Sequence, residues 1–526
     1  MDNTTEENNM NKTSEPEMKS EEKKSSSNTK RIAKNTLMLY FRQILIMLVS
    51  LYTVRVVLNV LGAEDYGIYN VVAGVVTMFG FLSNSMATAS QRYFSFDLGK
   101  GDTEHLKTTF SVTFQIYLLL IVIVLVVAET LGLWFVNHKL VIPAERLISA
   151  NIVYQAALFS FSMTLITTPY MASIIAHEKM TVYAYVSIVE VVLKLLIVFL
   201  LKILAFDKLG LYGILLAFVS FVVTGIYRFY CLKHFSECRI KFITEKKLFK
   251  EITAYSGWNL FGASVGVVKN QITNIFLNLY FGPVVNAARS IASQVNAAVT
   301  SFSNNFSTAV RPQIIKSYAA DKKDEMLSIM FTASRFTFFL MFLLACPICF
   351  NLEPLLGLWL KTVPDYTVLF TRLILIDVMI ESISYPLGTG IQATGKIKWY
   401  QIIVGSIYLL NLPISLIFLK FGYPPEIVFY ISICITFIAL VSRLFFMKYI
   451  IQFKFLSNIF LSNLFRILLV TVVVVTLLFF FSKFQFHFII KLVISYCIEA
   501  IVLLFIGLRK NEFVMLRNKI IYICKK

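Results

Sequence analysis

Apolar stretches long enough to cross a lipid bilayer recur along most of this chain, and they constrain its fold more than any other feature. A helix needs about 20 mainly apolar residues to cross a hydrocarbon core of about 30 Å. About fourteen such windows follow one another, which predicts an all-α integral membrane protein with about fourteen transmembrane helices. The expected helices cover residues 34–60, 66–91, 109–136, 146–175, 180–203, 209–232, 255–280, 284–310, 327–350, 366–393, 398–420, 426–447, 459–482 and 486–508.

The composition agrees with lipid as part of the solvent. Of the 526 residues, 57% are hydrophobic and only 15% are charged, a balance that ordinary soluble proteins do not show. In a soluble protein, the net charge of +19 would suggest a nucleic-acid partner. Here the basic residues lie between the apolar windows, where they set the membrane orientation, so we expect membrane lipid and no nucleic acid around the chain.

The distribution of Lys and Arg predicts the orientation of the chain in the membrane. About 30 of these residues fall in connections on the side that holds both ends of the chain, against about 8 on the opposite side. Cytoplasmic loops are enriched in positive residues, so both termini are predicted to be cytoplasmic. Residues 1–29 are rich in Glu, Lys, Asn and Ser and contain no apolar stretch, which predicts a disordered cytoplasmic tail.

Two blocks of the sequence repeat at a nearly constant displacement. The displacement that moves the segment 81–89 onto the segment 301–309 aligns four identical residues. A nearly equal displacement moves the segment 169–183 onto the segment 386–400 and aligns five identical residues. Each match is weak alone, but the near-constant displacement and the equivalent positions relative to helix ends indicate an internal repeat.

The repeat predicts how the chain is divided. The displacement of the first block also pairs Gly62 with Gly282, and one repeat holds six helices. Because six is even, both halves enter the membrane with the same orientation, related by a pseudo-two-fold axis along the membrane normal. After the tail we expect an N-terminal six-helix bundle at 30–235, a cytoplasmic amphipathic connector at 236–254, a C-terminal six-helix bundle at 255–450, and a final helix pair with the cytoplasmic C-terminus at 451–526.

Several short motifs resemble those of a known transporter family. They are the opening Ala33-Lys-Asn-Thr36, the turn Leu61-Gly-Ala-Glu-Asp-Tyr-Gly-Ile-Tyr69, and two blocks of the form Pro-x4-Ile-x-Ala-x2-Lys that begin at Pro169 and Pro386. The chain resembles the polysaccharide-exporter branch of the multidrug/oligosaccharidyl-lipid/polysaccharide (MOP) superfamily, which is MATE-like in fold. Within that branch it is most similar to Wzx-type O-antigen flippases, along nearly the whole chain after the N-terminal tail.

This resemblance implies a function and a location. Such flippases move undecaprenyl-pyrophosphate-linked oligosaccharides from the cytoplasmic to the outer leaflet of the bacterial plasma (inner) membrane, through a central basic cavity. The products enter surface polysaccharides such as the O-antigen of lipopolysaccharide, so polysaccharide polymerases and glycosyltransferases are the implied protein partners. The family has no compact catalytic motif, so we expect no enzyme activity, no catalytic residue and no cofactor.

Cations inside the apolar windows are candidates for binding the pyrophosphate. An ionisable residue at mid-membrane costs several kcal/mol unless it faces water, a partner or a substrate. Lys269 lies near the centre of its window on a stripe of small and polar residues, and Arg289 begins a second polar stripe. Together with Arg42, they are the predicted pyrophosphate-binding residues. The alternative is that these cations are structural, snorkelling to an interface or pairing with nearby carboxylates.

Acidic residues inside the windows point to ion coupling. Asp377 and Glu381 lie one helical turn apart, and two buried carboxylates at that spacing should share a proton, bind a cation or recruit a base such as Arg372. They are candidates for a proton or Na⁺ coupling site, and the alternative is a static ion network. Glu190 and Lys194 have the spacing of a structural ion pair. No spacing of residues predicts a metal site.

Four functions remain open at this point. The first is an ion-coupled flippase that alternates between inward-open and outward-open states. The second is a cation-coupled multidrug exporter of the same architecture, whose cavity should be acidic or aromatic. A membrane glycosyltransferase or polymerase would need outward-facing catalytic loops, which the short outer connections do not provide. A passive scaffold would not explain charges within the membrane in both halves.

Overall fold

The computed structural model describes residues 4–140, 142–203, 207–242, 245–360, 363–452, 458–484, 486–510 and 512–514, with side chains from Asn35 onward apart from a few positions. Every regular element in these ranges is a helix. A helix covers each of the predicted windows, which confirms the all-α architecture. Eight helices, or nine if Glu64–Thr77 and Gly80–Lys100 count as one span bent by 43°, are long and apolar enough to cross a membrane by themselves.

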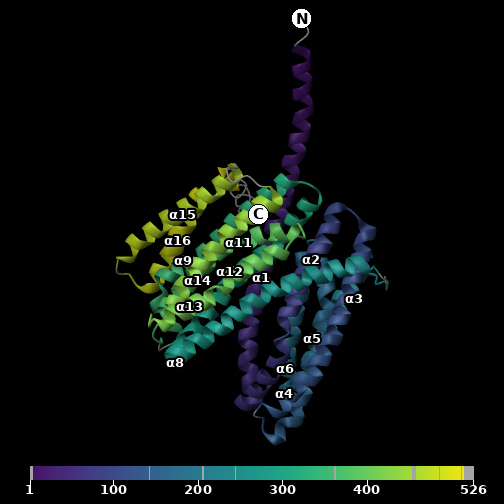
Figure 1. Cartoon of the computed structure of the whole chain (residues 1–526), viewed down its shortest axis with the longest axis vertical. Helices are drawn as coiled ribbons and strands as arrows, with labels where there is room; N and C mark the ends of the chain where they lie inside the picture. The colour runs from purple at the N-terminus through teal and green to yellow at the C-terminus, as the bar shows by residue number, and fades with distance from the viewer. Residues whose placement is uncertain are drawn as a thin grey trace.

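The helices form two halves and a peripheral pair (Figure 1). The first half contains α1 (Thr4–Thr77), α2 (Gly80–Lys100), α3 (Thr103–Val127), η1 (Ala128–Gly132), α4 (Leu133–His138), η2 (Ala144–Arg146), α5 (Leu147–Ala176), α6 (Met180–Ile203), α7 (Lys208–His234) and η3 (Ser236–Cys238). The second half contains α8 (Lys246–Ala319), α9 (Lys323–Phe350), α10 (Leu352–Leu360), α11 (Thr367–Ala393), α12 (Lys398–Leu409), α13 (Asn411–Lys420) and α14 (Ile427–Ile451). The pair is α15 (Asn458–Ser482) and α16 (Phe488–Val502), which η4 (Leu503–Gly507) extends.

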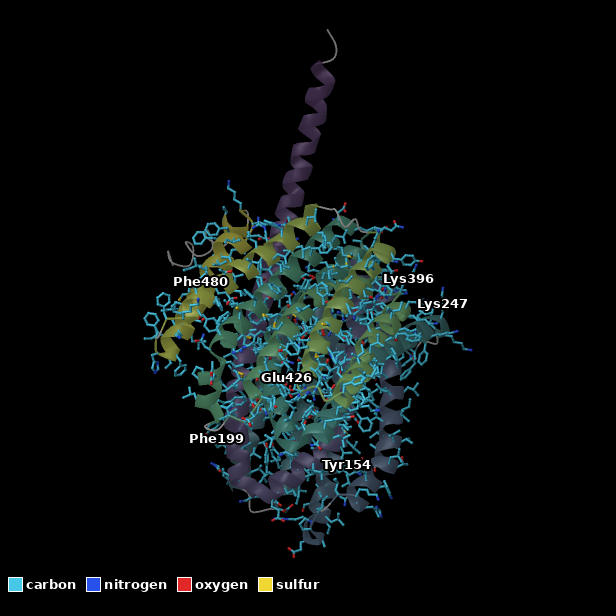
Figure 2. The ribbon with its side chains drawn as sticks, turned by 60° about the vertical axis from the view of Figure 1, so that its left-hand side comes forward. Tyr154, Phe199, Lys247, Lys396, Glu426 and Phe480 are labelled. Carbon is cyan, nitrogen blue, oxygen red and sulfur yellow. The ribbon has the colours of Figure 1, made fainter. Side chains whose placement is uncertain are left out.

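Large apolar side chains cover the outer surface of the helices. Phe199 on α6 and Phe480 on α15 project outward in Figure 2, with 40% and 58% of their surfaces exposed. In a soluble protein, so much exposed apolar area would be an aggregation hazard, whereas in a bilayer it faces the acyl chains.

Each half contains the same break in its first long helix. Gly62 in α1 has φ 83° and ψ 168°, and Gly282 in α8 has φ 80° and ψ −172°. These backbone angles favour glycine because a side chain would clash at positive φ. The second repeated block behaves alike, since Glu178 and Gly395, which the repeat also pairs, have φ values of 59° and 77°. The two halves therefore turn at positions that the sequence repeat pairs.

The two halves pack closely on one side of the molecule. We call the side that holds Lys100 and Ala319 the terminal side, because α1 enters from it and α16 returns to it. There α2 crosses α8 so closely that a Cβ atom on Gly99 would lie 2.7 Å from the Cα atom of Lys316 and 2.8 Å from the Cβ atom of Ala319. Only glycine fits this crossing, since real Cβ atoms do not approach so closely.

Two segments differ from their predicted structure. The segment 4–29, where we expect a disordered tail, continues α1 away from the bundle (Figure 1). In the expected connector, α8 already begins at Lys246, so residues 246–254 extend the first helix of the second half.

A buried carboxylate anchors the link between the halves. Glu237 in η3 accepts hydrogen bonds from His177 Nε2 at 2.6 Å and from Ser173 Oγ at 3.2 Å, both at the terminal-side end of α5. Burial by itself would raise the pKa of Glu237, but these hydrogen bonds outweigh it and hold the pKa below its ordinary value of 4.5. The ionised carboxylate therefore stabilises the fold above that pH.

Replacing Glu237 by glutamine is expected to lower the free energy of unfolding by about 1 kcal/mol at pH 7, seen as a loss of a few degrees in the melting temperature of the detergent-solubilised protein. A group with a lowered folded-state pKa gives its stability above the unfolded pKa and loses it as the pH falls. The difference between the two proteins should thus shrink below about pH 4. An equal difference at pH 7 and pH 3.5 would contradict the role of ionisation.

Candidate functional site

A polar pocket of about 350 Å³ lies inside the second half, among α8, α11, α12, α13 and α14. Its wall contains three cations and two carboxylates, together with amide, hydroxyl and apolar side chains. These five residues are Lys269, Arg289, Asp377, Glu381 and Arg443. Four of them are predicted site residues, so the structure brings together two of the three predicted pyrophosphate ligands and both coupling-ion candidates.

Lys269 and Asp377 are joined through a single hydroxyl group. The Lys269 Nζ atom donates a hydrogen bond to Ser432 Oγ at 2.8 Å, and Ser432 Oγ donates to Asp377 Oδ2 at 2.9 Å. The other carboxylate oxygen, Asp377 Oδ1, is buried and accepts no hydrogen bond from any residue that the structure describes. The ring of Tyr408 lies 5.3 Å from Lys269 Nζ and adds a cation–π contact. The Oδ1 atom of Asp377 is thus a buried acceptor that can bind a proton or a cation near Lys269.

Arg289 reaches the same pocket from beyond the break at Gly282. Its Nη1 atom donates to the Asn270 carbonyl oxygen at 3.1 Å and to Asn274 Oδ1, while its Nε atom has no partner within the described part of the chain. Only 7% of the residue is exposed. The break folds α8 back on itself, so the two arms of one helix carry Lys269 and Arg289 into the same space.

Arg443 on α14 is a third cation of the pocket, and it is not among the predicted site residues. Its Nε atom donates to the Tyr400 hydroxyl at 3.2 Å and its Nη1 atom to the Tyr408 hydroxyl at 3.3 Å. Its position inside the window 426–447 marks it as a candidate by the rule applied to the other intramembrane cations. The suggested recruitment of Arg372 by the acidic pair is wrong, because Arg372 is exposed and donates to the Cys349 carbonyl oxygen at 3.3 Å.

Arg42 lies elsewhere, at the junction between the halves. Its Nη1 atom is 3.5 Å from Asn305 Oδ1, and its guanidinium carbon is 4.5 Å from the centre of the Tyr183 ring. The predicted basic chamber was expected between the halves, whereas the pocket that holds Lys269 and Arg289 is lined by the second half. Glu190 and Lys194 form an ion pair of 2.6 Å on α6, outside this pocket.

The pocket chemistry suits phosphate oxygens and small cations. Lysine and arginine side chains give a diphosphate the charge-assisted hydrogen bonds that it needs, and Asp377 with Glu381 offers oxygens to a proton or Na⁺. Ligand pockets commonly measure about 300–1,000 Å³, so this one suits a diphosphate or an ion and not a whole oligosaccharide. Among the described residues, no group of three or more His, Cys, Asp or Glu has the arrangement of a metal site.

Polar contacts close the terminal side between the halves. The Lys316 Nζ atom is 2.8 Å from Glu178 Oε1, and Gln313 donates to the other oxygen of the same carboxylate. Nearby, Arg92 Nη2 donates to the Ala393 carbonyl oxygen at 3.1 Å. Within the described ranges, the hydrogen bonds and ion pairs seen between the two halves lie in the region between Arg42 and the terminal side of the molecule.

Two family models match the chain. The model described as "Polysaccharide biosynthesis protein" matches residues 32–318, more than half of the chain. The model described as "MatE" matches residues 260–417 in the second half. No curated protein matches the chain.

Solved transporter structures share the fold. A structure described as the outward-facing conformation of a multidrug resistance MATE family transporter of the MOP superfamily is similar with a TM-score of 0.70 and 12% identity, over 81% of this chain and 96% of that chain. The MATE transporter ClbM in complex with Rb⁺ gives a TM-score of 0.64 and 15% identity over 78% and 94%. A MOP superfamily transporter from Pyrococcus furiosus, whose binding pocket is described as having reverse polarity, gives 0.65 and 13% over 81% and 97%.

Proposed function

Because the chain belongs to the polysaccharide biosynthesis protein family of MOP-superfamily membrane transporters, we propose that it is a flippase for a polyprenyl-pyrophosphate-linked oligosaccharide. The carried lipid is undecaprenyl-linked, and it moves from the cytoplasmic to the outer leaflet of a bacterial plasma membrane. The oligosaccharide serves surface polysaccharide biosynthesis such as that of the O-antigen, alongside glycosyltransferases and a polymerase. Both termini lie in the cytoplasm under the positive-inside rule, so the terminal side is the cytoplasmic side.

One observation carries this proposal, namely the three cations that surround the pocket in the second half. Lys269, Arg289 and Arg443 outnumber the two carboxylates, so the pocket has room for the charge of an anionic head group. Arg42 at the junction of the halves would contact the diphosphate before or after it occupies the pocket. The polyprenyl tail stays in the bilayer while the charged head group passes between helices.

Alternating access explains the closed terminal side. In the structure, Glu178, Lys316 and Arg92 hold the halves together at what we infer to be the cytoplasmic end. This arrangement fits an outward-open state, in which the head group would be released to the outer leaflet. An inward-open state, which loads the next lipid, must break these contacts and separate α2 from α8.

The carboxylates link ion binding to substrate binding. Ionised Asp377 draws the Lys269 ammonium through Ser432, and Glu381 lines the same pocket. A proton or Na⁺ held by these carboxylates would release Lys269 to the diphosphate. The affinities for ion and substrate are then coupled, and each changes the other by the same factor.

The test is reconstitution of the purified protein in liposomes with a fluorescent undecaprenyl-pyrophosphate-linked oligosaccharide. We expect movement of the labelled lipid between leaflets, accelerated by a proton or Na⁺ gradient, and no movement of the same lipid carrying a neutral head group. The alternative is a cation-coupled multidrug exporter, which the MatE match and the carboxylates of the pocket favour. Extrusion of ethidium without any movement of the oligosaccharide lipid would support that alternative and refute the flippase.

In the same assay, Asp377→Asn is expected to remove the acceleration by the ion gradient, a fall of about tenfold in the driven rate. The amide still accepts the hydrogen bond from Ser432 but carries no charge for a proton or Na⁺ to neutralise. The double variant Glu190→Gln/Lys194→Met is the matched control, because it removes a carboxylate together with its ion-pair partner, outside the pocket. If Asp377→Asn keeps the full response to the gradient, Asp377 does not take part in coupling.

A further inference from the structure

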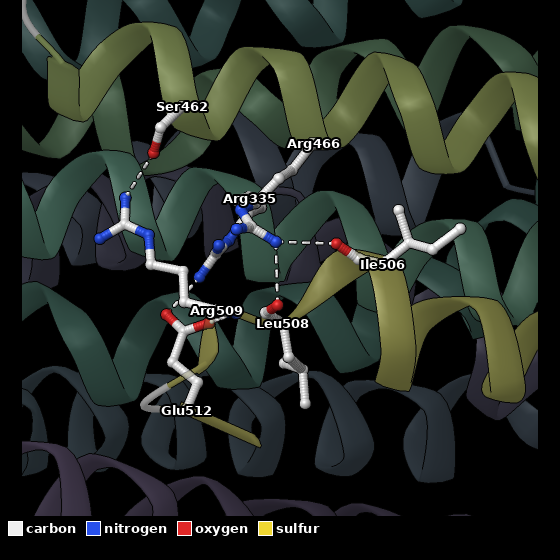
Figure 3. Close-up of polar contacts among 7 residues, drawn as sticks. All are labelled: Arg335, Ser462, Arg466, Ile506, Leu508, Arg509 and Glu512. Carbon is white, nitrogen blue, oxygen red and sulfur yellow. Dashed lines mark hydrogen bonds and ion pairs between the residues drawn. The ribbon is translucent and has the colours of Figure 1, made fainter. Parts of the chain in front are cut away.

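A second group of cations lies away from the pocket, where α9 meets α15 and the segment that follows α16. Arg335, Arg466 and Arg509 gather near a single carboxylate, that of Glu512 (Figure 3). Arg335 Nη2 forms an ion pair with Glu512 Oε1, and the backbone N–H of Arg509 donates to Glu512 Oε2 at 2.7 Å. We call these four residues the arginine cluster.

The single carboxylate does not balance the positive charge of the arginine cluster. Arg466 Nη1 donates to the carbonyl oxygens of Ile506 and Leu508 at 2.8 and 2.9 Å, and Arg509 Nη2 donates to Ser462 Oγ at 3.1 Å. These acceptors are neutral, so Glu512 is the one anion among the contacts of the three guanidinium groups drawn in Figure 3.

Arg335 is the cation that most needs another partner. None of its surface is exposed, and among the described residues its Nε and Nη1 atoms have no hydrogen-bond acceptor. A buried N–H group without an acceptor costs free energy, and a second anion beside the guanidinium group would remove that cost. Glu512 is 24% exposed at its side chain, so a ligand can reach the carboxylate position from outside.

We propose that the arginine cluster binds the phosphate group of a lipid on the terminal side of the membrane, and that Glu512 occupies this position until the phosphate displaces it. The helices α15 and α16 form one edge of the molecule (Figure 1), and they expose large apolar side chains that would face lipid. Clustered arginines near the end of a membrane helix attract anionic head groups, and their planar donors match phosphate oxygens two at a time. The source is either a bulk anionic phospholipid or the diphosphate of the carried lipid, and the second source rests on the proposed function.

The experiment measures lipid retention by the full-length protein in phosphatidylcholine nanodiscs, supplemented in separate arms with phosphatidylglycerol or with undecaprenyl diphosphate. We expect the protein to retain at least one of the two added lipids above the phosphatidylcholine background. Arg509→Gln should weaken retention about tenfold, because it removes one charge-assisted donor. Glu512→Gln should strengthen retention several-fold, because the amide competes less well than the carboxylate for the arginines. A gain of affinity cannot be explained by misfolding.

The matched control is Lys396→Gln, which removes one exposed positive charge from the loop after α11 (Figure 2). It should leave retention unchanged. Retention of phosphatidylglycerol alone assigns the site to bulk phospholipid, and retention of undecaprenyl diphosphate alone assigns it to the carried lipid. The proposal is overturned if neither lipid is retained, if Arg509→Gln behaves like Lys396→Gln, or if Glu512→Gln weakens retention. Because retention of phosphatidylglycerol requires no transport, this result is independent of whether the protein is a flippase.

Discussion

Replacing Lys269 by alanine should reduce the transport of lipid-linked oligosaccharide by about tenfold to a hundredfold. A hydrogen bond to a charged group contributes about 1.5–3 kcal/mol, and the ammonium is the donor that the diphosphate would meet beside Arg289. The variant also removes the positive end of the chain that runs through Ser432 to Asp377. The measurement is display of surface polysaccharide in a strain without redundant exporters, followed by the reconstituted assay.

The double variant Glu190→Gln/Lys194→Met provides the matched control for this prediction. Lys194 is also a lysine of a predicted spanning helix, but its ammonium is paired with Glu190 at 2.6 Å and does not line the pocket. The double variant removes both charges of the pair and leaves no unpaired charge on the helix, so transport should change little. Lys269→Arg should recover part of the activity because it keeps the charge. Normal polysaccharide display by Lys269→Ala would remove the phosphate-binding role of this residue.

Replacing Gly99 by leucine should reduce transport at least tenfold by preventing the halves from closing on the terminal side. A Cβ atom at this position would lie 2.7 Å from Lys316 Cα and 2.8 Å from the Lys316 carbonyl oxygen, and both are backbone atoms that cannot rotate away. Forcing extra carbon atoms into a packed contact costs about 1–3 kcal/mol or requires the helices to separate. Separation would hold the transporter away from the state in the structure.

Cysteine accessibility reports the conformational part of this prediction. A cysteine introduced at Ser85, where the hydroxyl contacts the Ser256 carbonyl oxygen between the halves, should be labelled faster in the Gly99→Leu background. Gly225→Leu on α7 is the matched control, since a Cβ atom there would meet nothing within 4 Å. Full transport by Gly99→Leu, with unchanged labelling, would show that this contact is not needed for the transport cycle.

The sequence predicts well how deep in the membrane each charged residue lies. It predicts less well which residues that charge contacts. Apolar windows place Lys269 and Asp377 within the membrane, and the repeat pairs the breaks at Gly62 and Gly282. The packing of each helix against its neighbours decides which partner a side chain meets, and neither hydropathy nor helical periodicity specifies that packing. For this reason the sequence suggests Arg372 as a partner of the acidic pair although it contacts Cys349. Arg443 is a different case, because its position inside an apolar window already marks it as a candidate.

The location of the pocket illustrates the same limit. A repeat of six helices predicts two equivalent halves, from which a chamber between them follows by symmetry. The cations do not obey that symmetry, because the positions that the repeat pairs with Lys269 and Arg289 hold the uncharged residues Val49 and Tyr69. The residues that line this polar pocket therefore belong to the second half, while Arg42 lies at the junction between the halves.

The hydroxyl of Ser432 has one hydrogen atom, and that hydrogen must point in a definite direction. With Asp377 ionised, it points at the carboxylate, and the lone pairs of the oxygen receive the ammonium of Lys269. A protonated Asp377 could become the donor, and the hydroxyl would then have to turn its hydrogen elsewhere while still facing the lysine. The direction of the Ser432 O–H bond thus depends on whether Asp377 is protonated, and it changes the group that Lys269 faces. No helix has to move for this change.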